Sequence, residues 1–68
     1  MSKIERMLWT GLALGLTRIR AIAFVRRSTG TTIDEVIAAA NTIPIESWDV
    51  NQAAWMDRFW SKFTHVSL

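Results

Sequence analysis

The chain has 68 residues, of which half are hydrophobic, with four tryptophans, no cysteine and a net charge of +2. This length allows one domain, residues 1–68, and the lack of cysteine excludes disulfides and cysteine-based zinc sites. So small a domain buries too little surface to be comfortably stable alone, so we expect dense aromatic packing or association with another molecule.

The charge is divided unevenly along the chain. Residues 1–30 hold six basic side chains and one acidic one, whereas residues 31–68 hold two basic and five acidic ones. Either the basic half contacts acidic lipid, nucleic acid or an acidic protein face, or the two halves attract each other within one fold. The candidates for contact with a polyanion are Arg18, Arg20, Arg26 and Arg27.

Residues 4–27 are predicted to form one long helix. Its run MLWTGLALGL is apolar nearly all round, which is typical of a buried or lipid-embedded helix. A membrane span needs about 20 apolar residues and would have to include Arg18 and Arg20, at about 2.5–3.5 kcal/mol each. We therefore expect a cytoplasmic protein, with flat association at a membrane surface as the alternative.

Gly11 and Gly15 lie inside this predicted helix, where each costs roughly 1 kcal/mol relative to alanine. We expect them to allow the close approach of another helix. The alternative is that the helix is broken near one of them. Residues 17–27 also show some strand-like alternation, but the chain offers no second strand to pair with it, which favours a helix.

A loop at residues 28–31 precedes a predicted short helix at 33–41, with Thr32 as its N-cap and Glu35 completing a capping box. Asn41 and Pro44 end that helix. The connector 42–48 is expected to contribute buried anchors, which are Ile43, Ile45 and Trp48.

The clearest periodicity lies at residues 49–66, which hold a predicted third helix at 49–65 capped by Asp49. Its apolar stripe consists of Trp55, Met56, Phe59, Trp60, Phe63 and Val66. We expect this stripe to form the core, with part of it left to dock a partner. The predicted fold is therefore all-α, with three helices at about 4–27, 33–41 and 49–65.

Catalytic and metal-binding chemistry is poorly supported by the sequence. His65 is the only histidine, and Ser47 has no evident base beside it. We expect neither an enzyme nor a cofactor. Residues 26–32 combine arginines, hydroxyls and a helix start that could hold a phosphate, but they lack the P-loop spacing, and a capped loop is the simpler interpretation. A helix–turn–helix is disfavoured because Glu46 and Asp49 would face DNA phosphates.

The sequence therefore predicts a non-catalytic accessory or assembly protein that binds a larger protein, inhibits it, or self-associates through aromatic and glycine-rich helix faces. The candidate interface residues are Trp9, Gly11, Gly15, Trp48, Trp55 and Trp60. Two alternatives stay open: peripheral attachment to an anionic membrane through the N-terminal helix, and nucleic-acid binding through its arginines.

Overall fold

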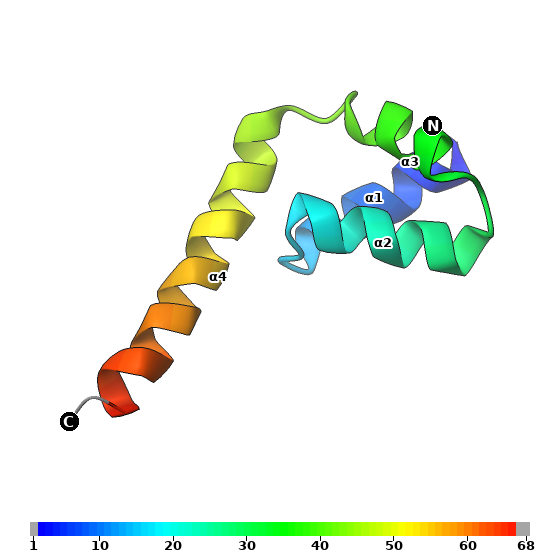
Figure 1. The fold of residues 1–68 in the computed structure, drawn as a ribbon. Coiled ribbons are helices and arrows are strands. Elements are labelled where there is room, and N and C mark those ends of the chain that lie inside the picture. Colours follow the sequence, from blue (N-terminus) through cyan, green and yellow to red (C-terminus); the bar gives the residue numbers. More distant parts are fainter. Residues whose placement is uncertain (1, 67–68) are drawn as a thin grey trace.

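The computed structural model describes residues 2–66, with side chains described for residues 2–62, and this part of the chain contains four α-helices and no strand (Figure 1). The helices are α1 (Lys3–Ala13), α2 (Arg18–Thr29), α3 (Ile33–Ala40) and α4 (Ile45–Val66). The all-α prediction is confirmed. The predicted number of three helices is wrong, because the expected helix 4–27 is divided into α1 and α2.

The division falls at Gly15. This residue has a φ of 85°, in the left-handed region that glycine adopts without steric strain. Its N–H donates to the Leu12 carbonyl at 3.0 Å, which closes the end of α1. Thr17 then caps α2, since its Oγ1 accepts from the Arg20 N–H at 3.4 Å. Gly15 therefore ends a helix rather than packing against one.

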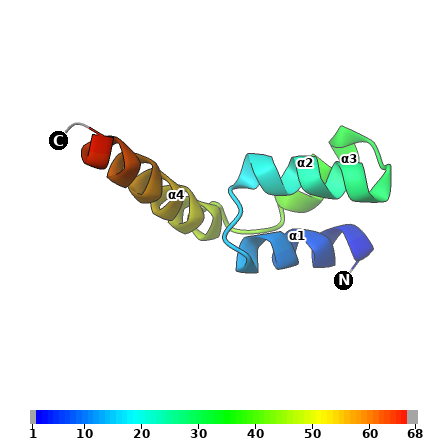
Figure 2. The same cartoon turned by 90° about the horizontal axis from the view of Figure 1, so that it is seen from below.

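Gly11 has the packing role that the sequence suggested, since it allows another helix to approach closely. It is buried, and a Cβ atom at this position would lie 3.3 Å from the Cβ of Ala21 on α2. The two helices run side by side in opposite directions, as Figure 2 shows. The pair of small residues lets their backbones approach closely, so this glycine serves packing within the chain.

The predicted ends of α3 are confirmed. The Thr32 Oγ1 accepts from the Glu35 N–H at 3.3 Å, and Asn41 is the C-cap. The Arg18 guanidinium donates to the Asn41 side-chain oxygen at 2.7 Å, which ties the start of α2 to the end of α3.

The core lies among α1, α2 and α3 and the first turn of α4. Its buried apolar residues are Leu8, Ala21, Ile22, Val25, Val36, Ala40, Ile43 and Trp48. Ile43 and Trp48 are anchors, as predicted, whereas Ile45 is exposed. The Trp48 indole N–H finds no acceptor among the described residues, so its burial is stabilised by apolar contact alone.

The last helix begins at Ile45, directly after Pro44, and not at the predicted N-cap Asp49. A proline just before or at the first helical position is well tolerated, because the N–H groups there have no helical partner. The earlier start places Trp48, Asn51 and Trp55 on one helix face, with spacings of three and seven residues. Trp48 can then enter the core as part of α4.

Beyond that first turn, α4 extends away from the other three helices (Figure 1). The molecule measures 47 × 22 × 17 Å, and its radius of gyration is 13.9 Å, against about 11 Å for a compact domain of this length. The predicted aromatic core at residues 55–63 is therefore wrong. Phe59 and Trp60 are 39% and 57% exposed, while the side chains of Phe63 and Val66 lie outside the described residues.

Candidate interaction surface

The contact between α4 and the rest of the chain centres on Asn51. Its side-chain Nδ2 donates to the carbonyl oxygens of Leu12 and Leu16, both at 2.9 Å. Leu12 lies in the last turn of α1, and its carbonyl also accepts from the Gly15 N–H. Asn51 therefore holds α4 against the turn between α1 and α2.

Trp55, one helical turn further along, makes the next contact. The Arg20 guanidinium of α2 lies 5.5 Å from the centroid of the Trp55 ring, within the range of a cation–π interaction. This contact fixes one end of a row of rings. Trp55 stacks on Phe59 with centroids 5.6 Å apart and planes 12° apart, and Phe59 meets Trp60 edge to face at 5.7 Å. All three rings of this row belong to α4, and each contacts the next.

We call Trp55, Met56, Phe59 and Trp60 the aromatic face of α4. Helical spacing puts these four side chains on one side of the helix, and their exposure increases from the partly buried Trp55 to Trp60. Since α4 leaves the three-helix body at this level, the outer end of the face is exposed.

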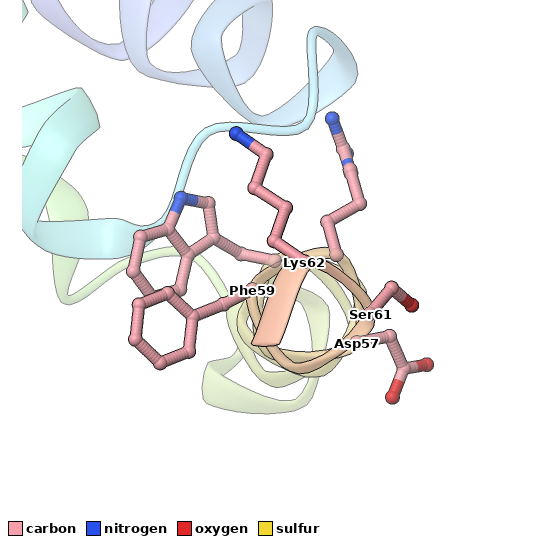
Figure 3. Close-up of a pocket in the computed structure, with 6 residues that line it drawn as sticks. Asp57, Phe59, Ser61 and Lys62 are labelled. Atoms are coloured by element: carbon pink, nitrogen blue, oxygen red, sulfur yellow. The ribbon is translucent and has the colours of Figure 1, made fainter. Parts of the chain in front are cut away.

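Basic and acidic side chains lie on different sides of the aromatic face. An open hollow of about 420 Å³ is lined by Trp55, Asp57, Arg58, Phe59, Ser61 and Lys62. Figure 3 shows Lys62 extending toward the turn between α1 and α2, and Asp57 and Ser61 lying on the side of α4 away from Phe59. The Arg58 guanidinium also approaches that turn, 4.0 Å from where a Gly15 Cβ would stand. Cations therefore gather where the rings leave the body, with Arg20 beside them.

The six predicted interface residues do not form one surface. Trp55 and Trp60 are brought together through Phe59, whereas Gly11 and Trp48 are buried inside the chain and Gly15 forms a turn. Trp9 is exposed on α1, 38% of its surface being accessible. The sequence-based list omitted Phe59, Arg58 and Lys62. The i, i+3, i+4, i+7 spacing from Trp55 places all three next to the predicted tryptophans, so the signal was available.

Three of the four candidate arginines are exposed along α2: Arg20, Arg26 and Arg27. Arg18 is half-buried and bonded to Asn41, so it serves the fold. Arg26 and Arg27 lie in the last turn of α2, where the helix dipole favours cations. Two apolar side chains of α2, Ile19 and Phe24, are also exposed.

Other kinds of site receive no support from the part of the chain that is described. Residues 2–66 contain no group of three or more His, Cys, Asp or Glu side chains placed to hold a metal ion. The side chain of His65 lies outside the described residues. None of the described helices combines the length and apolar character needed to cross a bilayer. Comparisons with protein-family models, with curated proteins and with solved structures find no match to this chain.

Proposed function

We propose that this protein is a non-catalytic accessory or assembly protein that binds another protein through the aromatic face of α4. The observation that carries the proposal is the exposure of Phe59 and Trp60 on a helix that extends beyond the core. Tryptophan is the residue most enriched among interface hot spots, and clustered exposed apolar side chains mark interaction sites.

The spacing of the face indicates the mode of binding. Met56, Phe59 and Trp60 follow the i, i+3, i+4 pattern by which an amphipathic helix inserts into an apolar groove of its partner. A larger complex, an enzyme that the chain inhibits, or a second copy could each supply such a groove. Gly11 on α1 already packs against Ala21 of the same chain, so the glycine-rich face is not part of this proposal.

Site-specific photocrosslinking tests the proposal. A photoreactive phenylalanine analogue replaces Trp60 in one variant and Val50 in another, because both positions are exposed on α4 but Val50 lies off the aromatic face. In extracts of the source cells, we expect a discrete protein adduct from position 60 and none from position 50. Equal adducts from the two positions, or none from either, would contradict the proposal.

A second candidate is peripheral attachment to an anionic membrane through the outer side of α2. Ile19 is 79% and Phe24 49% exposed, and Arg20, Arg26 and Arg27 are exposed on the same helix. This pattern suits insertion of apolar side chains between lipids while arginines contact headgroups. The apolar run of α1 is less suited to this role, because Leu8 is in the core and Leu12 packs against it.

Vesicle binding separates this candidate from nucleic-acid binding. Replacing both Ile19 and Phe24 by serine should abolish binding to phosphatidylserine vesicles and leave any DNA binding intact. Replacing Arg26 and Arg27 by glutamine should weaken both, and added salt should do the same. Phosphatidylcholine vesicles serve as the uncharged control. If wild-type protein binds both kinds of vesicle equally, or neither, attachment to an anionic membrane is excluded.

A further inference from the structure

We infer that the aromatic face of α4 binds a second copy of this chain, in a head-to-tail contact with the outer side of α3. The inference rests on the function proposed for α4 and names one partner for it. The two surfaces carry opposite charges and lie at opposite ends of the molecule.

The outer side of α3 is acidic and apolar. Ile33 and Ile37 are exposed one helical turn apart, and Asp34 and Glu35 are exposed beside them. Ala38 completes this surface, which we call the α3 face. Ala38 lies four residues after Asp34 and three after Glu35, and its small side chain leaves room for a large one beside the two carboxylates.

The charges on the two faces are complementary. Arg58, Lys62 and Arg20 gather beside the aromatic face, and the α3 face carries two carboxylates. Complementary charge steers association and fixes the orientation of the contact, while the apolar centre supplies affinity.

The two faces lie at opposite ends of the molecule. Figures 1 and 2 show α3 at the far side of the body from the outer end of α4, along a longest dimension of 47 Å. They cannot meet within one chain. A contact between unlike faces leaves one of each free, so it propagates into an open chain of copies or closes into a ring. The smallest specific interfaces bury about 600 Å² per partner, a modest share of the 5098 Å² surface.

Sedimentation velocity over a concentration series tests the inference. Wild type should form dimers and longer species as concentration rises, and salt should dissociate them. Trp60→Ala should weaken association roughly thirtyfold, the loss typical of an interface hot spot. Ala38→Lys should weaken it similarly by repelling Arg58 and Lys62. It should leave α3 folded, because the new cation lies four residues after Asp34 and pairs with it.

Mixing the two variants gives the sharpest result. The Ala38→Lys chain keeps a working aromatic face and the Trp60→Ala chain keeps a working α3 face, so the mixture should form a one-to-one complex and nothing longer. Val50→Ala, which shortens an exposed side chain of α4 outside both faces, is the matched control and should associate like wild type. Circular dichroism confirms that each variant is folded.

Two outcomes would overturn the inference. Wild type that stays monomeric throughout rules out self-association. Association lost in Trp60→Ala but unchanged in Ala38→Lys would show that two aromatic faces pair with each other instead. A monomeric wild type whose position 60 still crosslinks to a protein of another mass would leave the proposed function standing, whereas absence of both self-association and crosslinks would remove both.

Discussion

At the residue scale, Asn51 is the side chain that joins two parts of the fold. Asn51→Ala removes the side-chain donor for the Leu16 carbonyl and one of the donors for the Leu12 carbonyl, which also accepts from the Gly15 N–H. A partly buried carbonyl left without a donor costs about 1–3 kcal/mol. Urea unfolding should report this loss. Gln52→Ala, an exposed neighbour on the same helix, should change the free energy of unfolding by less than about 0.5 kcal/mol. Equal effects of the two substitutions would show that the hydrogen bonds to Leu12 and Leu16 contribute nothing.

The backbone at Gly15 gives a second prediction at this scale. Its φ of 85° is strained for a residue with a Cβ, so Gly15→Ala should destabilise the fold by about 1–2 kcal/mol. Gly15→Asn should cost less, because asparagine adopts this region more readily. The difference between their thermal midpoints measures the effect. An alanine variant as stable as wild type would mean that the turn has another conformation.

At the scale of the helices, most of the buried apolar side chains belong to α1, α2 and α3. Leu8→Ala truncates a fully buried side chain and should cost about 2–5 kcal/mol. Phe59→Ala should cost only about 1 kcal/mol, which is the value of its stacking on Trp55. Thermal unfolding of the two variants compares them directly. A larger loss for Phe59 than for Leu8 would restore the aromatic core that the sequence suggested.

Local signals in the sequence predicted much of the helical structure. Thr32 and Asn41 bound α3 as expected, because a cap depends on neighbours three or four residues away. The place where one helix becomes two was harder to find, since Gly11 and Gly15 have the same local context. What distinguishes them is Ala21, which meets Gly11 only after α2 has folded back along α1.

The aromatic face was misassigned for a related reason. Periodicity shows that Trp55, Phe59 and Trp60 share a side of a helix, but it does not show whether the rest of the chain is long enough to cover that side. Asn51 carried no signal at all, because its acceptors lie 39 and 35 residues earlier in the chain. Fold class and caps were therefore predictable, while the placement of α4 depended on distant contacts.

For the whole molecule, the elongated shape of the structure can be measured in solution. Small-angle scattering of the Ala38→Lys variant, which should remain monomeric, is expected to give a radius of gyration near the 13.9 Å of the structure. A compact domain would give about 11 Å. A value near the smaller figure would show that α4 folds back over the body in solution and would remove the surface proposed here.

Asn51 attaches α4 near its start, so a small rotation there moves the outer end of the helix by a larger distance. Lys62 lies eleven residues further along the helix, about 16 Å away at 1.5 Å per residue. A rotation of about 10° around Asn51 would therefore carry Lys62, just beyond the outer end of the aromatic face, by about 3 Å, close to the width of a side chain. Small changes in the turn at Leu14–Leu16 are magnified along this arm, so a substitution remote from every ring can redirect the whole aromatic face toward a different partner.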